Sequence, residues 1–548
     1  MRVRELLVKA LVGEGIDTIF ALMGAANRNL MCDLGMPDRA RVVQGRHEAA
    51  VVSMADGYAR FNRQVGVALV SAGPGLTNTA TALAVARSHR SPVLVLAGDV
   101  PMQDTNNPQC LDQLAFGRVL AGGAGKIACS DCWHIEWARA IATLREELPY
   151  VLSLPVDVQE SLGPDVLPAE DMPTPTDEVV PGLAAAAGLL VGSGQVGIVA
   201  GAGAVDASDE LCRLADRLGA VLTTTIRAAG LFAGHSMDAG VLGALGDGRA
   251  LQALMRCDVI LAVGTSLHRL AVPDLPEQVR IVRVDTDAVV AISAPPTHSV
   301  LETTVLHATT LLNEMLSDKP REEASPWIRR ILTRRSPIDD RPWLDREDAV
   351  DPRHALADLA ALLPNRRGVV IGGGHCAMTA CQMITPTRHD EWTCASIDFG
   401  AIGQSLPIAI GACFARPDLR IFLITGDGDL MMSVAELDTA VRHQLALTVI
   451  VLNDNGFGQE RHDLQTHGQP TCYADYRSPD FASLATALGA RGHRIAGPNQ
   501  LSDLEQALNP AQGVVVIDIQ ITPDYVNPSS RMLGAILAGK STVLEYTN

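Results

Sequence analysis

The chain has 548 residues and a formal net charge of −18 at pH 7; 47% of its residues are hydrophobic and 4% are aromatic. This length exceeds what one hydrophobic core normally serves, so we expect three domains. The negative charge, without Lys and Arg clusters, argues against nucleic acid or an anionic membrane as a partner, and the lack of a signal peptide or long apolar run favours a soluble cytoplasmic protein.

The first domain is expected over residues 1–162. It opens with an amphipathic helix that breaks at Gly13 to Gly15 and leads into a short strand. Farther on, a strand at 65–71, a Gly-Pro-Gly turn, a helix and a strand at 92–98 make a βαβ pattern, which is typical of a parallel sheet.

The eleven cysteines are odd in number and scattered, which indicates reduced thiols and not a disulfide framework. Cys129 and Cys132 have the spacing of half a zinc site, but no second ligand pair completes it. We expect Asp131 to cap the helix that follows and this segment to be structural.

Two breaks divide the rest of the chain. Residues 161–181 are rich in Pro and acids and indicate a linker, and residues 318–352 are charged and punctuated by Pro. We therefore expect a central domain over 180–318, a third domain over 350–530 and a tail over 531–548. Apolar strand patterns recur in both domains, at 196–204, 259–265, 280–286, 368–374, 420–428, 447–455 and 513–519. The fold class predicted is α/β, with three doubly wound parallel-sheet domains.

A strand-helix-strand pattern at 423–458 carries two acidic residues, Asp427 after the first strand and Asp454 after the second. Parallel strands joined by one helix end at the same edge of a sheet, so both carboxylates are expected there. Neighbouring strands lie about 5 Å apart, so the two carboxylates can share Mg²⁺. The alternative is that both are ordinary turn residues. Ser433 and Glu436 are expected to form a capping box for the intervening helix, which should end near Gln444.

Four motifs stand in one order along the chain: "RHEAAVVSMADGYAR" (46–60), "SAGPGLTN" (71–78), "FGAIGQSLPIAIGA" (399–412) and the GDG stretch that starts at Gly426. Together they resemble the thiamine-diphosphate-dependent superfamily of acetolactate synthases, benzaldehyde lyases and 2-oxo acid decarboxylases. The resemblance covers nearly the whole chain. It implies a pyrimidine-binding first domain, a central domain and a diphosphate-binding third domain.

The resemblance also implies a cofactor site. Asp427, Asp454 and the Gly456 carbonyl would ligate Mg²⁺, although the family commonly has Asn at the second position. The other residues implied to bind thiamine diphosphate are Pro74, Asn78, Gly374, His375, Gly400, Ile402, Gly428 and Asp429, with Ile402 bending the cofactor.

Glu48 matches the family's glutamate that hydrogen-bonds the aminopyrimidine ring and promotes loss of the thiazolium C2 proton. In this family the site forms between the first domain of one subunit and the third domain of another. A homodimer or homotetramer is therefore implied, in which Glu48 and Asp427 meet across an interface. Without the other motifs, Glu48 would be an ordinary acid at a helix start.

The reaction is predicted from residues near the reacting carbon. Gln113, or Gln109 if the match slips, lies where acetolactate synthases keep a catalytic Gln. Ala25 and Ala26 stand where decarboxylases and benzaldehyde lyase have catalytic His, and no adjacent His pair is present. These features favour an acetolactate-synthase-like carboligase or lyase that acts on 2-oxo acids such as pyruvate, or on aldehydes, with a simple decarboxylase or a benzaldehyde-lyase-type lyase as the alternatives.

Other features leave the substrate open. The segment after the metal motif, "GFGQERHDL", lacks the Trp of biosynthetic acetolactate synthases, and Gln459, Glu460 and His462 are candidates for contacting a different substrate. Gly201 to Ala204 is a weak signal for FAD that packing would explain equally well. Two other classes stay open: a nicotinamide enzyme that uses the central domain, and a catalytically silent regulatory subunit.

Overall fold

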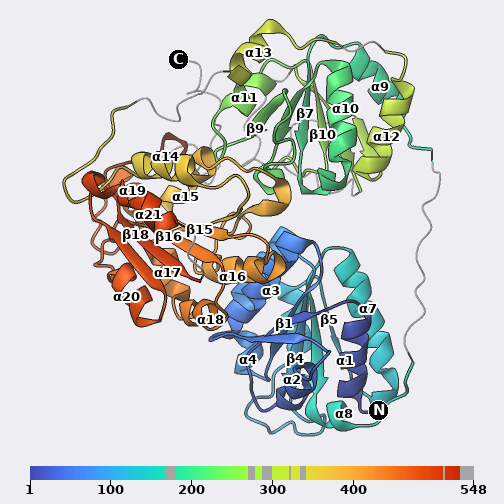
Figure 1. Cartoon of the computed structure of the whole chain (residues 1–548). Coiled ribbons are helices and arrows are strands. Elements are labelled where there is room, and N and C mark those ends of the chain that lie inside the picture. The colour runs from blue at the N-terminus through green and yellow to red at the C-terminus, as the bar shows by residue number, and fades with distance from the viewer. Residues whose placement is uncertain are drawn as a thin grey trace.

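In a computed structural model, the chain folds around three parallel sheets of six strands each (Figure 1). The structure describes residues 1–166, 179–268, 278–286, 299–319, 322–333, 341–509 and 513–530. The strand pairings between named strands are all parallel within these ranges, as the apolar strand patterns predict. The α/β fold with three doubly wound domains is confirmed; most of the expected linker at 161–181 and the whole tail at 531–548 lie outside the described residues.

The first sheet has the strand order β2-β1-β3-β4-β6-β5. Its strands are β1 (Thr18–Ala21), β2 (Arg41–Gln44), β3 (Gly66–Val70), β4 (Val93–Asp99), β5 (Gly123–Lys126) and β6 (Tyr150–Pro155). The helices around it are α1 (Val3–Gly13), α2 (Arg28–Leu34), α3 (Glu48–Asn62), α4 (Pro74–Thr77), α5 (Ala80–His89), α6 (Gln113–Leu120), η1 (Ser130–Cys132), α7 (Trp133–Arg145) and α8 (Val156–Glu160).

The second sheet has the order β12-β11-β10-β7-β8-β9 and forms the central domain. Its strands are β7 (Val196–Ala200), β8 (Val221–Thr224), β9 (Asp238–Val241), β10 (Val259–Val263), β11 (Arg280–Asp285) and β12 (Ser299–Glu302). Its helices are α9 (Leu183–Val191), η2 (Ala202–Ala207), α10 (Ser208–Leu218), η3 (Ile226–Ala228), α11 (Arg249–Leu254), α12 (Val305–Met315) and α13 (Pro326–Thr333). Helix α13 lies in the charged stretch expected to be a break, yet Ile328 is buried in the central core.

The third sheet has the order β14-β13-β15-β16-β18-β17. Its strands are β13 (Gly368–Ile371), β14 (Trp392–Cys394), β15 (Ile421–Gly426), β16 (Leu447–Asn453), β17 (Arg491–Ile495) and β18 (Val515–Gln520). Its helices are α14 (Pro352–Leu362), α15 (His375–Met383), η5 (His389–Glu391), α16 (Ser405–Ala415), α17 (Asp427–Ser433), α18 (Glu436–Arg442), α19 (Gly458–Thr466), α20 (Phe481–Ala487), η6 (Pro498–Gln500) and α21 (Asp503–Leu508).

The first and third domains share one hydrophobic core, although the whole central domain separates them in the sequence. Helix α3 packs against α16 between the two sheets, as Figure 1 shows near its centre. A Cβ on Gly57 would lie 2.1 Å from the carbonyl oxygen of Ile408, and one on Gly411 would lie 2.0 Å from that of Met54. The two glycines therefore let the helix backbones approach closely.

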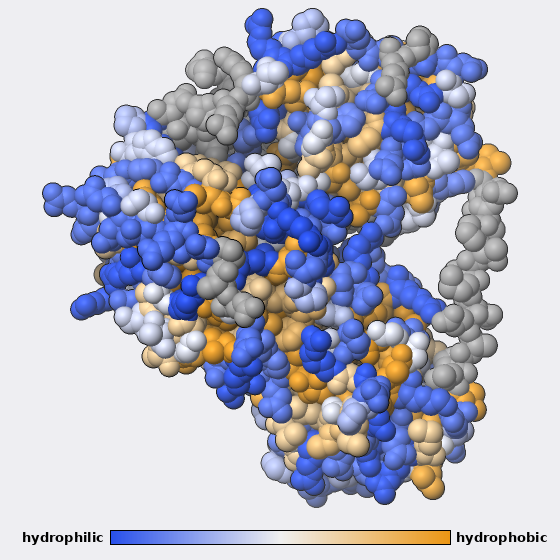
Figure 2. All heavy atoms as spheres, in the orientation of Figure 1, coloured by the Kyte–Doolittle hydropathy of each residue, from blue (hydrophilic) through white to orange (hydrophobic). Residues whose placement is uncertain are grey.

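On the face drawn in Figure 2, apolar and hydrophilic residues are interspersed, with apolar groups visible where the first and third domains adjoin. Among the described residues, no helix combines the length and the hydropathy that a membrane crossing requires.

Candidate functional site

Three neighbouring strands of the third sheet bring the predicted cofactor-binding residues to one edge. β13, β15 and β16 are adjacent, and the chain continues from them into Gly372, Asp427 and Asp454, respectively. The register pairs Gly426 with Leu452, so Asp427 and Asp454 both follow directly at the carboxyl edge. The prediction that the two aspartates share this edge agrees with the geometry.

The two aspartates are buried and influence each other. Asp427 is 2% exposed and Asp454 is 6% exposed. Burial and the charge of Asp454 raise the pKa of Asp427 to about 6, and burial raises the pKa of Asp454. The Asp427 carboxylate accepts hydrogen bonds from the Gly456 amide at 3.1 Å and from the Ser478 hydroxyl. A cation between the carboxylates would offset their repulsion.

Arg461 compensates part of the negative charge at this edge. Its NH1 lies 2.8 Å from Oδ2 of Asp454, and its Nε lies 2.5 Å from Oδ1 of Asp475. Arg461 and Asp454 are both buried, so their contact is shielded from water, whereas Asp475 is exposed. The sequence analysis did not identify Arg461 as a partner of Asp454. The signal that could have found it is the short spacing: Asp454 follows β16, and Arg461 lies seven residues later in the first turn of α19.

The Asp429 side chain joins three segments of the third domain, a role that the sequence did not indicate. Its Oδ2 accepts hydrogen bonds from the Gly373 amide at 2.6 Å and from the hydroxyls of Ser405 and Thr425 at 2.7 Å each, and its Oδ1 accepts one from the Gly403 amide. Asp429 therefore fixes the glycine loop after β13 relative to the loop that carries Ile402.

Ile402 lies over the glycine loop. A Cβ on Gly373 would meet Cγ2 of Ile402 at 2.4 Å, so the isoleucine side chain rests directly on that backbone. Gly400 and Gly374 have positive φ values of 69° and 103°, which glycine adopts without strain. Gly428 faces Phe457 and Tyr476, since a Cβ there would lie 2.8 Å from each side chain.

His375 is buried at the start of α15, next to Asp454. Its Nδ1 lies 3.5 Å from Oδ2 of Asp454, and burial, together with the neighbouring His462 and Arg461, lowers the pKa of His375 to about 3. The imidazole is therefore neutral at pH 7 and can donate one hydrogen bond. His375 also contacts His462 edge to face, with ring centroids 4.9 Å apart.

The three residues suggested for substrate contact in α19 have different environments. His462 is 4% exposed, and its Nε2 lies 2.9 Å from the Pro523 carbonyl oxygen. Its ring packs against His375. Gln459 is half-buried and Glu460 is exposed. Of the three, these two remain accessible to a substrate.

The expected capping box at Ser433 and Glu436 is wrong. The helix begins at Asp427 and not after the GDG turn, and it is interrupted between α17 and α18. The Ser433 hydroxyl has no hydrogen-bond partner within the described ranges. The Glu436 carboxylate instead accepts the backbone amides of Arg46 and His47, at 2.9 and 3.1 Å, and so holds the start of α3.

A second group of candidate residues lies at the carboxyl edge of the first sheet. Glu48 begins α3 after β2, and Pro74 begins α4 after β3. The Asn78 amide donates a hydrogen bond to Glu48 at 3.0 Å. Glu48 is half-buried, while Pro74 and Asn78 are exposed on the single chain.

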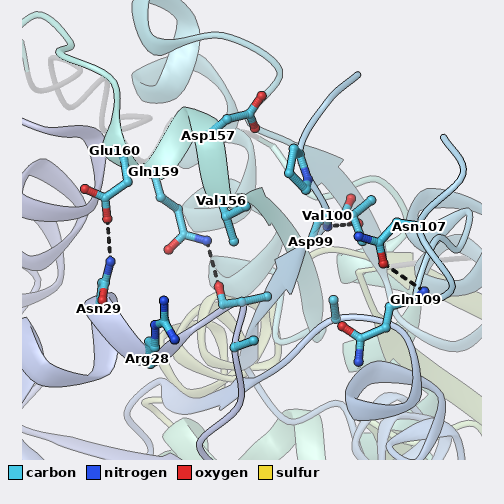
Figure 3. A pocket seen from close by; sticks show the side chains of 14 residues that line it. Arg28, Asn29, Asp99, Val100, Asn107, Gln109, Val156, Asp157, Gln159 and Glu160 are labelled. Carbon is cyan, nitrogen blue, oxygen red and sulfur yellow. Dashed lines mark hydrogen bonds between the residues drawn. The ribbon is translucent and has the colours of Figure 1, made fainter. Parts of the chain in front are cut away.

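The same edge holds a cavity of about 390 Å³, drawn in Figure 3. Ala25, Ala26 and Gln109 line it. Gln113, the preferred of the two glutamines in the sequence prediction, is fully buried in α6, where its amide donates to the Gly98 carbonyl oxygen at 2.9 Å. The helical phase of α6 directs Gln113 into the core, and Gln109, in the preceding loop, reaches the cavity.

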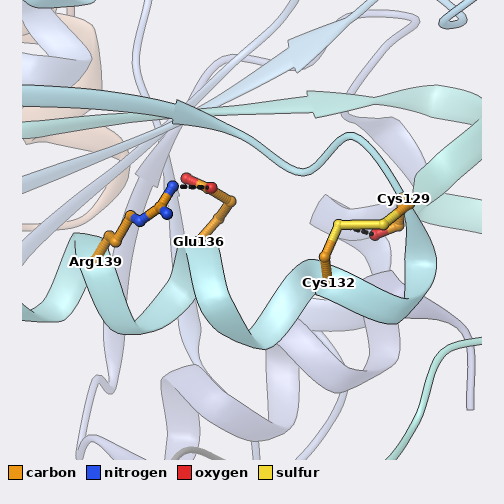
Figure 4. Close-up of a disulfide and its surroundings, with 4 residues drawn as sticks. All are labelled: Cys129, Cys132, Glu136 and Arg139. Carbon is orange, nitrogen blue, oxygen red and sulfur yellow. Dashed lines mark hydrogen bonds and ion pairs between the residues drawn. A yellow bond between two sulfur atoms is a disulfide. The ribbon is translucent and has the colours of Figure 1, made fainter.

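Cys129 and Cys132 form a disulfide, which corrects the expectation of reduced thiols at this position (Figure 4). Asp131 lies inside the short helix η1, and Cys132 is the N-cap of α7, so Asp131 does not cap that helix. The remaining cysteines within the described ranges are free, in agreement with the prediction.

The glycines at the start of the central domain are explained by packing. A Cβ on Gly201 would lie 2.2 Å from the carbonyl oxygen of Gly264, and one on Gly264 would lie 2.4 Å from the backbone of Gly203. Two backbone segments cross closely here. The sequence Gly-Ala-Gly-Ala is thus accounted for without FAD.

The third-domain edge suits a metal ion that is shared with a ligand. No group of three or more His, Cys, Asp and Glu side chains with metal-binding geometry exists within the residues described. Asp427 and Asp454 supply two carboxylates, and Mg²⁺ usually completes its oxygen shell with backbone carbonyls, water and substrate phosphates. The donor set therefore fits Mg²⁺ held together with a diphosphate and does not fit a metal held by side chains alone.

Comparisons with family models match all three domains. The N-terminal thiamine pyrophosphate-binding domain matches residues 1–116, the central domain of thiamine pyrophosphate enzymes matches residues 183–303, and the C-terminal thiamine pyrophosphate-binding domain matches residues 372–519. The two matched cofactor-binding domains are those whose carboxyl edges carry the candidate residues.

Among curated proteins, the chain is 27% identical to a probable acetolactate synthase large subunit of Methanocaldococcus jannaschii, over 96% of this chain and 93% of that protein. It is 26% identical to a sulfoacetaldehyde acetyltransferase of Castellaniella defragrans, over 96% and 94% of the two chains. Among solved structures, a thiamine diphosphate-dependent 4-hydroxybenzoylformate decarboxylase of Rhodococcus jostii is similar with a TM-score of 0.81 at 23% identity, covering 95% of this chain and 99% of that one.

Proposed function

The chain belongs to the thiamine pyrophosphate enzyme family, and from this premise we propose that it is a thiamine diphosphate- and Mg²⁺-dependent carboligase or lyase. It would make or break a C–C bond next to a carbonyl. The reaction proposed is decarboxylation of a 2-oxo acid such as pyruvate, followed by ligation to a second carbonyl compound. The names of the acetolactate synthase and acetyltransferase relatives support this class.

We assign the diphosphate and Mg²⁺ to the third-domain edge. Asp427, Asp454 and the Gly456 carbonyl would hold the metal, and the backbone of Gly374 and Gly428 would approach the diphosphate. His375, neutral because of burial, would donate one hydrogen bond to a diphosphate oxygen. When bound, the thiazolium ring would supply an electron sink for cleavage beside a carbonyl.

We assign Glu48 the role of hydrogen-bonding the aminopyrimidine ring and so promoting loss of the thiazolium C2 proton. Asn78 holds one of its carboxylate oxygens, and Glu436 fixes the backbone in front of it, so the side chain is oriented before any ligand binds. This preorganisation supports a general acid–base role.

We propose that the site is completed by a second copy of the chain, in a homodimer or homotetramer. Glu48 makes its contacts within the first-domain edge and Asp427 within the third-domain edge. Three large apolar side chains close to the Ile402 loop are exposed in the single chain, Phe399 at 59%, Met431 at 48% and Met432 at 57%. Covering them with another subunit would remove apolar surface from water beside the cofactor site.

The observation that carries the choice of reaction is the composition of the first-domain cavity. Its lining contains alanines at 25 and 26 and no histidine. Of its carboxylates, Asp99 is engaged by Lys126 at 2.8 Å, and Glu160 by Asn29 at 2.8 Å. A simple decarboxylase needs a proton donor that quenches the reacting carbon, whereas this cavity offers room for a second carbonyl compound and the Gln109 amide to orient it.

The test is to incubate the purified protein with Mg²⁺, thiamine diphosphate and a panel of 2-oxo acids and aldehydes, and to measure CO₂ and coupled products together. We expect a 2-hydroxy ketone or 2-hydroxy-3-oxo acid in amounts comparable to the CO₂ released. Release of CO₂ with only the aldehyde would show a simple decarboxylase, and cleavage of a 2-hydroxy ketone without CO₂ would show a benzaldehyde-lyase-type reaction.

FAD is not part of the proposal because backbone packing accounts for the glycines at 201 and 203. A nicotinamide enzyme would leave Glu48 and the paired aspartates without a role. A regulatory subunit without activity would not need a Glu48 oriented by Asn78 and Glu436.

A further inference from the structure

The cavity at the first-domain edge contains both acidic and basic side chains, and the acidic ones are already engaged. Asp99 accepts from Ser153 and Lys126, each at 2.8 Å. Asp157 accepts the Met102 amide at 3.1 Å.

Glu160 is engaged as well. It pairs with Arg2 and Arg4 and accepts from Asn29, whose hydrogen bond lowers the pKa of Glu160. These carboxylates therefore do not call for a cationic ligand.

The basic side chain of the cavity is not engaged in the same way. Arg28 lines the cavity from the start of α2, and its guanidinium makes no hydrogen bond or ion pair with any residue that the structure describes. Its neighbour Asn29 is turned to Glu160 instead, as Figure 3 shows. Among the charged side chains that line the cavity, Arg28 is thus the one without a partner among the described residues, and its charge is positive.

A second polar side chain, Gln109, also faces the cavity with its amide unengaged by the described residues, while its backbone amide is held by Asn107 at 3.0 Å. In the view of Figure 3, Arg28 and Gln109 lie on opposite sides of the cavity. The Gln159 amide donates to the Ala26 carbonyl oxygen at 3.0 Å. Ala25 and Ala26 also line the cavity, and their small side chains leave the space between Arg28 and Gln109 open.

We propose that Arg28 determines specificity for a substrate that carries an anionic group, a carboxylate, sulfonate or phosphonate, at the end remote from the reacting carbonyl. This inference rests on the proposed function, since it identifies the substrate class of that site. The guanidinium offers several N–H donors in a planar fork that matches such oxyanions. Gln109 then orients the carbonyl end of the same molecule.

The test uses substrate pairs matched in length. 2-Oxoglutarate and 2-oxopentanoate are compared as donors, and succinic semialdehyde and butanal as acceptors, with the holoenzyme and product detection for each. We expect wild type to prefer the charged member of at least one pair by about 10-fold or more in kcat/KM. In Arg28→Met this ratio falls by about 10- to 100-fold, the range of a charge-assisted hydrogen bond, and Arg28→Lys retains part of it.

Arg39→Met is the matched control. Arg39 is also an exposed arginine of this domain, close after α2, and it donates to the Asp33 carbonyl oxygen at 2.8 Å outside the cavity. Its substitution should leave the charged-to-neutral ratio at the wild-type value. Equal kcat/KM for both members of both pairs in wild type, or an unchanged ratio in Arg28→Met, would overturn the inference.

A failure of the proposed function has a different signature, because no member of any pair then gives CO₂ or coupled product. Calorimetry with glutarate and pentanoate on the cofactor-loaded protein tests the anion site without turnover. We expect glutarate to bind wild type more tightly than pentanoate does, and Arg28→Met to lose that difference. Equal binding of the two acids by wild type would refute the site itself.

Discussion

Asp454 stands where the family resemblance implied an Asn, and in the structure it has a charged partner, Arg461. A carboxylate in place of an amide adds negative charge beside an expected diphosphate. Arg461, at 2.8 Å from Asp454, offsets part of that charge while Asp475 holds its other side. The extra carboxylate of Asp454 is thus paired with an arginine that lies seven residues later in the chain.

Removing each aspartate separately should have opposite effects on cofactor binding. We expect Asp454→Asn to retain or tighten binding of thiamine diphosphate and Mg²⁺, because an amide oxygen can still ligate and one negative charge is lost. Asp427→Ala should abolish binding. Cofactor content and calorimetric titration of the apo protein measure both. Release of the cofactor by Asp454→Asn would show that the second carboxylate is itself a required ligand.

At the residue scale, the sequence predicted where site residues lie but not which partners hold them. Asp427 and Asp454 follow recognisable strands, so their common edge could be inferred. The hydrogen bonds of Asp429 to Gly373, Gly403 and Ser405 join segments far apart in the sequence, and no local pattern encodes them. The sequence could not decide between Gln113 and Gln109 for a similar reason: a loop ends and a helix begins between them, and only the fold shows that Gln113 is buried and that Gln109 lines the cavity.

At the element scale, the buried parallel strands were predictable because they are continuous apolar runs bounded by glycines and polar residues. The predicted strands at 420–428 and 447–455 correspond to β15 and β16. The break between α17 and α18 was not predictable, because the bond that replaces the capping box joins Glu436 to the backbone of Arg46, 390 residues away.

The crossing of α3 and α16 should be intolerant of added volume. Gly57→Ala or Gly411→Ala places a methyl group against a backbone carbonyl oxygen, at 2.1 and 2.0 Å, and the helices must separate. We expect a loss of stability of about 1–3 kcal/mol, measured as an earlier midpoint in urea unfolding.

Gly188→Ala is the matched control for this crossing. It is also a helix glycine, in α9, but a Cβ there would meet nothing within 4 Å. It should gain about 0.5–1 kcal/mol from improved helix propensity. Equal stability of Gly57→Ala, Gly411→Ala and wild type would contradict the close packing of α3 on α16.

At the scale of the whole molecule, one buried carboxylate joins all three domains. Asp398, just before the Ile402 loop, contacts Arg60 at 3.1 Å and His89 at 2.8 Å from the first domain, and Arg227 at 2.8 Å from the central domain. Its side chain is fully buried. Such a junction depends on the tertiary fold and could not be read from the sequence.

This junction predicts a loss of stability in acid. Burial alone would raise the pKa of Asp398, but the contacts with His89, Arg60 and Arg227 outweigh it and hold that pKa below the usual range. Burial and the Arg60 charge lower the pKa of His89. Both groups bind protons more readily when unfolded, so stability should fall as pH drops below about 6.5 for His89 and below about 4 for Asp398.

Asp398→Asn tests the junction, because it leaves the buried Arg60 and the partly buried Arg227 without their shared anion. We expect a loss of about 3 kcal/mol at pH 7, measured by urea unfolding, and a difference from wild type that shrinks only as the pH falls below about 4, where unfolded Asp398 becomes protonated. Asp206→Asn breaks another pair between the first and central domains, with Arg63 at 2.6 Å, but that pair is exposed and should contribute less than about 1 kcal/mol. Equal effects of the two substitutions would argue against a special role for Asp398.

The most direct measurement is the exchange of the C2 proton of thiamine diphosphate bound to the purified protein, followed in D₂O by NMR after acid quench. With Mg²⁺, wild type should exchange this proton at least about 100-fold faster than the free cofactor, and Glu48→Gln should bind the same amount of cofactor but lose that acceleration. Exchange in wild type no faster than in free solution, or full acceleration in Glu48→Gln, would contradict a catalytic site that depends on Glu48.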